Sequence, residues 1–564
     1  MFEPGPLQSL LLWLDAEPAR YWVTAWTVSG ATGLAAAFAS DDPARGAVRR
    51  RFGKLGFAFL ILATLAAFRW PAWPVRAEFN PDESLSISGA ITLREHFVPW
   101  KYTDTGSHGP VAETLLVAMA WLGAPLDHVT ARILAILLQA LSLIAAWRVL
   151  AGFTSERIAR LGILPGLAFW AFISWVDFVH YAMELPGITL VALGAWALTP
   201  ALSDPEGRTS PVRLFLGGAA LGTTPLSKLQ LVPLAGALGL LALGLLARRF
   251  WRTRRPGDGR PAMVLLTGAL TPLLLLAVYL LVYGLVGQFW RAYILSAFDY
   301  TADGHYPFRE MGGWFFHFSA TAFGFAWFFW GTLAFCLLFA RQPDRAFRGP
   351  LLAAWTLLGV AMYCVLRPSR EVAHYLHILV IPLTLLAGLT LAAGSAAVER
   401  RAPLGLFLAF ALLALLPQIH HRAITGVPHL GYLQVNLSKP PSQAATYLLQ
   451  HRHPGDTLAM WGWEPILFVE TGMVQGTREA AIIYPNPRSR LRDFYVGRYK
   501  SDLLRRRPAW FVDAVGPGSF VYEDRATYGH ETIPEISEVI ARDYELVADM
   551  ESKRIYKRRA DPSP

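Results

Sequence analysis

Residues 128–150 read HVTARILAILLQALSLIAAWRVL, a long apolar run whose charged side chains lie near its two ends. An α-helix needs about 20 predominantly apolar residues to cross the hydrocarbon core of a bilayer. Similar runs recur along the chain of 564 residues, of which 54% are hydrophobic and 16% are charged. Soluble domains contain about 25% charged residues. The sequence therefore predicts a polytopic α-helical membrane protein.

The apolar runs predict about twelve transmembrane helices. The run near 213–226 is short, and the run near 20–39 is only moderately apolar. The twelve lie near residues 20–39, 55–75, 128–150, 158–177, 181–199, 213–226, 228–247, 262–285, 315–340, 349–366, 374–394 and 402–420.

Basic residues gather in every second connecting segment. They occur in segments 40–54, 248–260 and 341–348, and as the pairs Arg157/Arg160, Arg208/Arg213 and Arg400/Arg401. Cytoplasmic loops of membrane proteins carry such an excess of lysine and arginine. The other loops, among them 76–127, 286–314 and 367–373, are then expected to face outward. The net charge of +10 follows from this pattern, so no nucleic-acid partner is expected.

After residue 421 charges become frequent and long apolar runs stop. Short β-rich pieces, at 456–462, 509–515 and 554–559, alternate with helical ones at 442–452 and 490–506. This alternation predicts a soluble, outward-facing α/β domain over residues 421–564. We expect residues 1–54 to hold an extra span and a basic loop, and residues 55–420 to form the membrane domain with outer loop 76–127. Residues 111–126 fit an interfacial helix.

The predicted outer face carries several polar residues. Asp82 and Glu83 are adjacent in FNPDESLSISGA, residues 79–90, and the same loop brings Tyr102 and His108 in a stretch rich in aromatic and small polar residues. Such mixtures suit contact with carbohydrate or lipid headgroups. Glu184 lies at the outer end of a span, where an ionisable group is costly and indicates function. Solvated surface and snorkelling side chains are the alternatives.

Cationic residues also occur on this side, where they are otherwise scarce. Lys228 lies between two apolar runs, and Arg367, Arg370, His374 and Tyr375 follow one another before a late span. Arginine binds phosphate oxygens with two parallel hydrogen bonds and keeps its charge. These residues are therefore candidates for a phosphate site, with snorkelling or ordinary anionic lipid as the alternatives.

A divalent metal is a weaker expectation. Asp299, Asp303 and His305 occur in outer loop 286–314 and are residue types that bind divalent ions. Cys336 and Cys364 lie inside apolar runs, so neither a disulfide nor a cysteine metal site is expected.

Five motifs occur in an order that resembles the GT-C membrane glycosyltransferases, and in particular glycosyltransferase family 39. That family includes protein O-mannosyltransferases and the lipid A aminoarabinose transferase. PDE follows a span, and HGPV comes some 25 residues later. The others are MELPGITLVALGAWAL (183–198), GTTPLSKLQLVPL (222–234) and RPSREVAHYLHILVIPLTLLAG (367–388). Two features depart from the family: the span near 20–39 precedes the usual first helix, and SHGP replaces a loop that more usually contains lysine or proline.

The resemblance implies a sugar donor linked to polyprenyl phosphate and an acceptor in the cell envelope, whether glycan, lipid or protein. By analogy, Asp82 is the base and Glu83 orients it or binds sugar or acceptor. The residues expected to bind the donor phosphate are Lys228, Arg367, Arg370, His374 and Tyr375. Glu184, His108 and Tyr102 are expected to bind sugar or acceptor. Direct displacement would invert the anomeric centre.

The composition, rich in alanine, leucine and arginine and poor in cysteine, is typical of a bacterial protein, here of the cytoplasmic membrane with its active site outside. Two other functions fit parts of the pattern. A transporter or flippase for a lipid-linked anion would use the same outer cations but needs polar groups at mid-membrane depth, which the spans nearly lack. A non-catalytic membrane scaffold would leave Asp82 dispensable.

Overall fold

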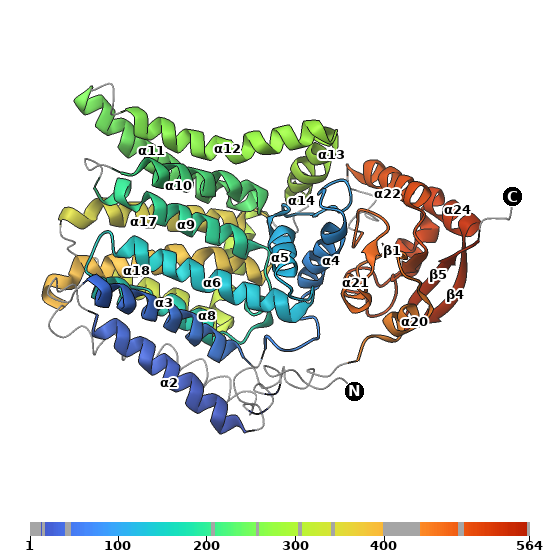
Figure 1. Cartoon of the computed structure of the whole chain (residues 1–564), viewed down its shortest axis with the longest axis horizontal. Helices are drawn as coiled ribbons and strands as arrows, with labels where there is room; N and C mark the ends of the chain where they lie inside the picture. Colours follow the sequence, from blue (N-terminus) through green and yellow to red (C-terminus); the bar gives the residue numbers. More distant parts are fainter. Residues whose placement is uncertain are drawn as a thin grey trace. The chain divides into compact units, whose positions relative to one another are not determined.

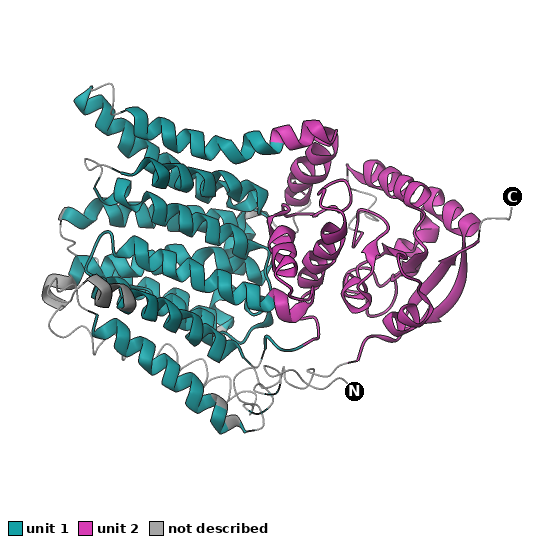
Figure 2. Ribbon diagram, viewed as in Figure 1, with its two compact units in different colours: residues 1–75, 132–276, 305–437 teal, residues 76–131, 277–304, 438–564 magenta. Residues whose placement is uncertain are grey.

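The computed structural model describes most of the chain as two compact units (Figures 1 and 2). Unit 1 comprises residues 1–75, 132–276 and 305–437, and unit 2 comprises residues 76–131, 277–304 and 438–564. The described residues are Ser9, Trp13, 17–39, 47–70, 72–204, 209–254, 259–302, 307–339, 345–398, 440–482 and 490–560.

Unit 1 is a bundle of helices joined by short connections. Its helices are α2 (Pro18–Ala37), α3 (Ala47–Arg69), α6 (His128–Leu150), α7 (Glu156–Gly162), α8 (Leu164–Phe172), α9 (Glu184–Ser203), α10 (Pro211–Thr223), α11 (Val232–Thr253), α12 (Arg260–Val282), α15 (Phe308–Thr321), α16 (Phe323–Phe339), α17 (Arg345–Leu366) and α18 (His377–Val398).

Among the described residues, six helices are long and apolar enough to cross a membrane, and they coincide with six of the twelve predicted spans. These are His128–Leu150, Glu184–Ser203, Leu229–Thr253, Arg260–Val282, Ala346–Leu366 and Ala373–Gly394. A seventh span is formed if the pair α15 and α16, bent by 104°, crosses as one. The chain is thus a multi-pass membrane protein.

The other predicted spans have different outcomes. The run near 158–177 is divided between α7 and α8, and α10 is a helix of only 13 residues. The runs near 20–39 and 55–75 form α2 and α3. The run near 402–420 lies outside the described residues. The count of twelve therefore stays a prediction.

Burial within the bundle separates central helices from peripheral ones. The apolar window of α18 is 89% buried, and α7, α16 and α17 pack against this helix. Helices α7 and α18 approach closely where Gly162 faces Gly388. A Cβ at Gly162 would lie only 2.7 Å from Gly388 Cα, so a larger residue would not fit there. In contrast, the window of α12 is 17% buried, and leucines such as Leu274 and Leu281 are more than 60% exposed. Such a continuous apolar surface is stable against lipid rather than water.

Unit 2 joins segments that are far apart in the sequence. The outer loop contributes two helices, α4 (Pro81–Glu95) and α5 (Val111–Trp121). Helix α5 lies within residues 111–126, where an interfacial helix was expected. Residues 277–304 add α13 (Val286–Phe289), the π-helical turn η5 (Trp290–Leu295) and α14 (Ser296–Ala302). The C-terminal part adds α20 (Gln443–His451), β1 (Thr457–Trp461), α21 (Ile466–Thr471), β2 (Val474–Gln475), α22 (Arg492–Arg506), β3 (Trp510–Asp513), α23 (Arg525–Tyr528), α24 (Pro534–Asp543), β4 (Tyr544–Met550) and β5 (Lys553–Arg558).

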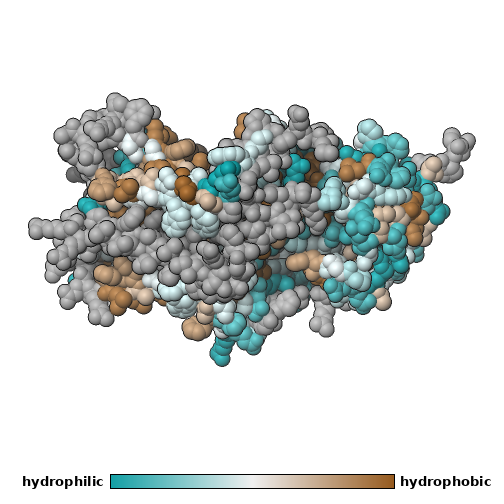
Figure 3. All heavy atoms as spheres, turned by 90° about the horizontal axis from the view of Figure 1, so that it is seen from below, coloured by the Kyte–Doolittle hydropathy of each residue, from teal (hydrophilic) through white to brown (hydrophobic). Residues whose placement is uncertain are grey.

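The five strands form one mixed sheet in the order β2-β1-β3-β5-β4. Strand β1 pairs in parallel with β2 and β3, and β5 pairs antiparallel with β3 and β4. Both faces are covered: α20 and α21 pack on the face of Leu458 and Met460, and α22 and α24 on the face of Ala459 and Trp461. A strand buried on both faces needs apolar residues at successive positions, as β1 has. On the face seen in Figure 3, this part carries mainly hydrophilic residues.

Candidate active site

Two predicted motifs of unit 1 meet in a buried ion pair. Lys228 lies in the extended connection between two short 3₁₀ helices, η2 (Thr224–Leu226) and η3 (Leu229–Leu231). Its Nζ donates a hydrogen bond to Glu184 Oε1, and both residues are buried. Glu184 opens α9, where the partial positive charge of a helix N-terminus also stabilises a carboxylate. The approach requires Gly187, because a Cβ there would lie 2.4 Å from Leu231 Cδ1.

Two more predicted residues join this pair from the short 3₁₀ helix η6 (Ala373–Leu376). His374 Nε2 lies 3.9 Å from Glu184 Oε1, and its Nδ1 lies 3.7 Å from Asp177 Oδ1. The ring of Tyr375 lies 4.8 Å from Lys228 Nζ, close enough for a cation–π interaction. We call Asp177, Glu184, Lys228, His374 and Tyr375 the Lys228 cluster.

Polar atoms at the Lys228 cluster retain capacity for a ligand. Among the described residues, Glu184 Oε2 and the hydroxyl of Ser227 are buried and make no hydrogen bond. The ammonium of Lys228 has three N–H donors, of which Glu184 takes one. Buried polar atoms are usually paired with protein or ordered water, so unsatisfied ones indicate a place for a polar group.

Arg367 and Arg370 lie on the loop between α17 and η6. Arg367 is exposed and Arg370 is half-buried, and Ser369 between them takes a positive φ of 57° that turns the chain sharply. This loop leads directly into His374. Whether the two arginines reach a ligand at the Lys228 cluster stays a prediction.

The predicted carboxylates of unit 2 lie in the first turn of α4. Pro81 opens this helix, and Asn80 caps it by accepting a hydrogen bond of 3.0 Å from the backbone N–H of Asp82. Capping by Asn and Pro at the first position are both favourable helix starts. Asp82 is half-buried and Glu83 is fully buried.

A third carboxylate near this turn was not expected from the sequence. Burial raises the pKa of Glu78 to about 7, against a hydrogen bond with Ser84, and the negative charges of Glu464, Glu83 and Asp82 raise it further. Glu78 Oε2 is buried and makes no hydrogen bond with described residues. In the sequence, the one feature that could have drawn attention to Glu78 is its position two residues before Asn80, the capping residue of α4.

His108 and Tyr102 lie in the outer loop of unit 2. His108 Nε2 is 2.5 Å from Glu113 Oε1, and both side chains are buried. Room for Glu113 comes from Gly89 of α4, where a Cβ would lie 2.8 Å from Glu113 Cγ. Tyr102 is half-buried, and its ring stacks on His96 at 4.5 Å. The structure thus ties His108 to a carboxylate that sequence reasoning missed.

A fully buried arginine connects the outer loop to the C-terminal part within unit 2. Arg498 donates hydrogen bonds to Asp104 and Glu479, and its Nη1 lies 3.4 Å from Gln288 Oε1. Burial opposes the charge, but the carboxylates of Glu479 and Asp104 outweigh it and raise the pKa of Arg498. We call Asp104, Glu479 and Arg498 the Arg498 cluster. In the sequence, Arg498 lies three residues after Tyr495, so both residues share one face of a predicted helix. This spacing was the one feature that could have pointed to Arg498.

The expectation of a metal in outer loop 286–314 stays a prediction. Asp299 lies in α14, but Asp303 and His305 are outside the described residues. Within the described residues, the ligand atoms of Asp513, His530 and Glu531 lie close enough together to hold an ion. However, Asp513 Oδ2 already lies 2.5 Å from His530 Nδ1 and 3.1 Å from Arg525 Nη1. An arginine occupying the carboxylate disfavours a cation there.

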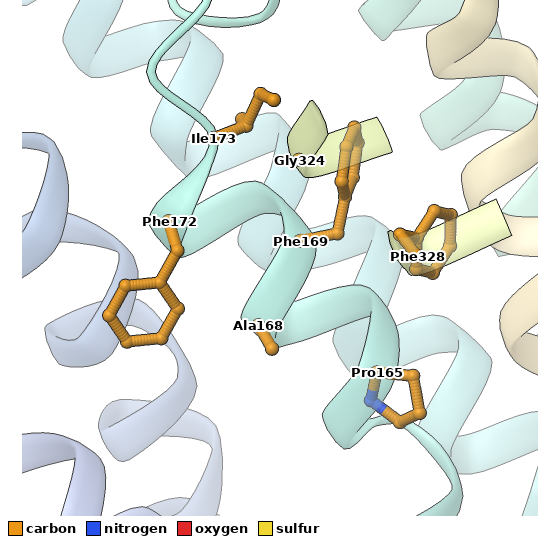
Figure 4. A pocket seen from close by; sticks show the side chains of 7 residues that line it. All are labelled: Pro165, Ala168, Phe169, Phe172, Ile173, Gly324 and Phe328. Carbon is orange, nitrogen blue, oxygen red and sulfur yellow. The ribbon is translucent and has the colours of Figure 1, made fainter. Parts of the chain in front are cut away.

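A small apolar pocket, with a cavity volume of about 10 Å³, lies in unit 1, between α8 and α16 (Figure 4). The rings of Phe169 and Phe328 stack across it at 4.6 Å. Its other lining residues are Pro165, Ala168, Phe172, Ile173 and Gly324. The pocket offers contacts to hydrocarbon and no charged group.

Comparison with solved structures places this architecture. The chain is similar to ArnT from Cupriavidus metallidurans bound to undecaprenyl phosphate, with 14% identity, a TM-score of 0.54, and coverage of 92% of this chain and 100% of that one. The apo state of ArnT gives 14% identity and a TM-score of 0.53 over 90% of this chain and 99% of that one. A third similar structure is an oligosaccharyltransferase from Archaeoglobus fulgidus in complex with zinc and sulfate, with 14% identity over 82% of this chain and 68% of that one. Its TM-score is 0.42, which is below the level that indicates a shared fold. No family model and no curated protein matches the sequence. The chain therefore shares the fold of ArnT.

Proposed function

We propose that this protein is a glycosyltransferase that moves a sugar from a polyprenyl-phosphate donor to a cell-envelope acceptor at the outer face of a bacterial cytoplasmic membrane. The observation that carries the proposal is the Lys228 cluster, a buried cation with unused hydrogen-bonding capacity in a bundle of membrane helices. The shared fold with a protein bound to undecaprenyl phosphate supports the donor class.

The Lys228 cluster suits a departing lipid phosphate. Lys228 supplies charge and N–H donors, and His374 adds a ring nitrogen from η6. Phosphate bound by such groups is stabilised as negative charge develops on it in the transition state. The phosphate leaves as an anion, so the reaction needs no general acid. Arg367 and Arg370 would complete the phosphate contacts, and Glu184 would meet the sugar.

The remaining requirement is a base for the acceptor hydroxyl, which we assign to Asp82. Its position in the first turn of a capped helix fixes the backbone that carries it. Glu83 orients the site from its buried position in the same turn. Transfer by one direct displacement inverts the anomeric configuration.

Replacement of Asp82 by Asn tests the base. General-base catalysis contributes about 10²–10⁴-fold to rate. We therefore expect Asp82→Asn to reduce transfer from a radiolabelled polyprenyl-phosphate sugar at least 100-fold, while purified full-length protein still binds undecaprenyl phosphate. The matched control is Asp493→Asn, at an exposed aspartate of α22. Transfer that is unchanged in Asp82→Asn removes Asp82 from the mechanism.

The same preparation separates the alternatives. A flippase would move a fluorescent lipid phosphate across proteoliposomes equally well with Asp82→Asn, and a scaffold would bind no undecaprenyl phosphate at all. Sidedness is tested by a cysteine introduced at position 493. A membrane-impermeant maleimide should label it in intact cells stripped of the outer membrane, and labelling only after lysis would contradict the outward orientation.

A further inference from the structure

One face of α4 lies against the C-terminal part of unit 2. Residues three or four apart share a helix face, and Asp82, Leu85, Ser88 and Thr92 follow that spacing. Leu85 packs on the core beneath β1. Ser88 Oγ lies 3.4 Å from Gln475 Nε2, and Thr92 Oγ1 accepts a hydrogen bond of 3.2 Å from the Gln475 N–H. The stripe that begins at Asp82 therefore faces this part of the chain.

The segment between β1 and α21 lies near the N-terminal end of the same helix. Helix α21 packs against α4, and Glu464 comes two residues before α21 begins. The packing of α21 on α4 brings this segment towards the first turn of α4, and the charges of Glu464, Glu83 and Asp82 each raise the pKa of Glu78. Glu464 also lies 3.3 Å from Lys553 Nζ, which holds its side chain in one orientation.

A partly buried tryptophan, Trp463, which packs against the core of the C-terminal part, and an exposed phenylalanine, Phe520, adjoin Glu464. The rings of Trp463 and Phe520 lie 6.0 Å apart, and Phe520 is 61% exposed on a surface that is mainly hydrophilic. Trp463 Nε1 is buried and has no partner among the described residues. Gly462, at a φ of 104°, makes the turn that precedes Trp463. An aromatic face and a fixed carboxylate are groups that a sugar ring can use together.

We propose that Trp463, Glu464 and Phe520 bind a carbohydrate ring of the acceptor beside Asp82. The inference rests on the proposed function and names its acceptor class. The C–H face of the sugar packs on the exposed ring of Phe520 and on the accessible part of Trp463, and its hydroxyls reach Glu464. One acceptor hydroxyl then attacks the anomeric carbon of the donor. Its O–H proton passes to Asp82, the new C–O bond forms, and the bond to the phosphate oxygen breaks, releasing polyprenyl phosphate.

The experiment measures transfer by full-length protein to the solubilised envelope of a deletion strain, with radiolabelled lipid-linked sugar from the same strain as donor. We expect Trp463→Ala and Phe520→Ala each to raise the apparent KM for the envelope acceptor about tenfold. The apparent KM for the donor and the binding of undecaprenyl phosphate should not change. Trp463→Tyr, which keeps an aromatic ring, should restore most of the acceptor affinity. Leu546→Ala, at an exposed residue of the edge strand β4, is the matched control.

Two treatments of the envelope identify the acceptor class. Periodate, which cleaves sugar diols, should abolish acceptor activity, and exhaustive proteolysis should preserve it. Loss of activity after proteolysis alone would mean a protein acceptor and would overturn the proposal. An unchanged acceptor KM in both aromatic variants would also overturn the proposal. The effect of Asp82→Asn on transfer tests the proposed function independently of this result. A rise in donor KM equal to that for acceptor would assign these residues to folding.

Discussion

The Lys228 cluster and the Arg498 cluster contain the same chemistry but leave different groups unused. In unit 2, the guanidinium of Arg498 is occupied by Asp104, Glu479 and Gln288, and the ring of Tyr495 lies 4.6 Å from it. In unit 1, Lys228 has one carboxylate and one ring as partners. Each nitrogen of the Arg498 guanidinium has a protein partner, whereas the three-donor ammonium of Lys228 donates one hydrogen bond to protein.

The difference indicates what each cluster is for. A buried charge is costly unless its partners satisfy it, so a cluster that satisfies itself is structural. The Arg498 cluster ties the outer loop to α22 and thereby holds unit 2 together. The Lys228 cluster, with Glu184 Oε2 unpaired among the described residues, has room for an incoming anion to take over the lysine. Each of the following changes tests this division.

The largest effect is expected for Arg498→Met. Removing one partner of a buried ion pair typically costs about 3–5 kcal/mol, because the other charges remain buried. Here Asp104 and Glu479 would be left without a cation. We expect chemical denaturation of purified protein to register this loss, and limited proteolysis to cut unit 2 while unit 1 stays protected. Arg542→Met, at an exposed arginine whose partner is Asp543, should leave stability unchanged. Equal stability of the two variants would mean that the Arg498 cluster is not structural.

The second effect is on ligand binding at the Lys228 cluster. Glu184→Gln removes the carboxylate that competes for Lys228 and should maintain or tighten the binding of undecaprenyl phosphate. The double variant Lys228→Met/Glu184→Gln then removes the cation without leaving a buried charge. Hydrogen bonds to charged groups contribute about 1.5–3 kcal/mol, so its affinity should fall about 10- to 100-fold relative to Glu184→Gln. Isothermal titration in detergent measures both, and equal affinities would assign Lys228 a structural role like that of Arg498.

Sequence reasoning recovered the parts of this comparison that depend on composition and spacing. Lys228 and Glu184 were singled out because an ionisable group at a membrane-helix end is costly, and His374 and Tyr375 because they follow Arg367 and Arg370 before a late span. The structure brings these four residues together, and their roles stay predictions. The strands β1, β3 and β5 lie at the β-rich pieces. Arg498, Glu479 and Glu113 were not recognised, because a charge in a polar segment is ordinary until tertiary packing buries it. Nor does local pattern indicate that residues 76–131 pack with residues 438–564 in one unit.

A smaller effect is expected from pH at Glu78. Its pKa of about 7 in the folded protein exceeds the ordinary 4.5, mainly through burial. Between these pH values the folded protein holds a proton that the unfolded chain has released, so stability from this group is present below pH 4.5 and is lost as pH rises through 7. Because Glu78 is only partly buried, we expect a loss of about 1–2 kcal/mol. Melting curves at pH 5 and pH 8 should differ less for Glu78→Gln than for the wild type. Parallel pH profiles would mean that Glu78 is charged in both states.

The smallest expected effect concerns the contact between α4 and β2. Thr92→Val removes the hydroxyl that accepts the Gln475 N–H and leaves a buried donor unpaired, at a cost of about 1 kcal/mol. The change keeps the size of the side chain, so packing is preserved. Thr114→Val, which removes a hydroxyl bonded within the first turn of α5, is the control. Amide exchange at Gln475 gives the sharper measurement, because it reports the one donor concerned. Faster amide exchange at Gln475 in Thr92→Val, with the Arg498 cluster intact, would mean that the contact between α4 and β2 can open independently of that cluster. Unchanged exchange would mean that unit 2 depends on Arg498 rather than on this contact.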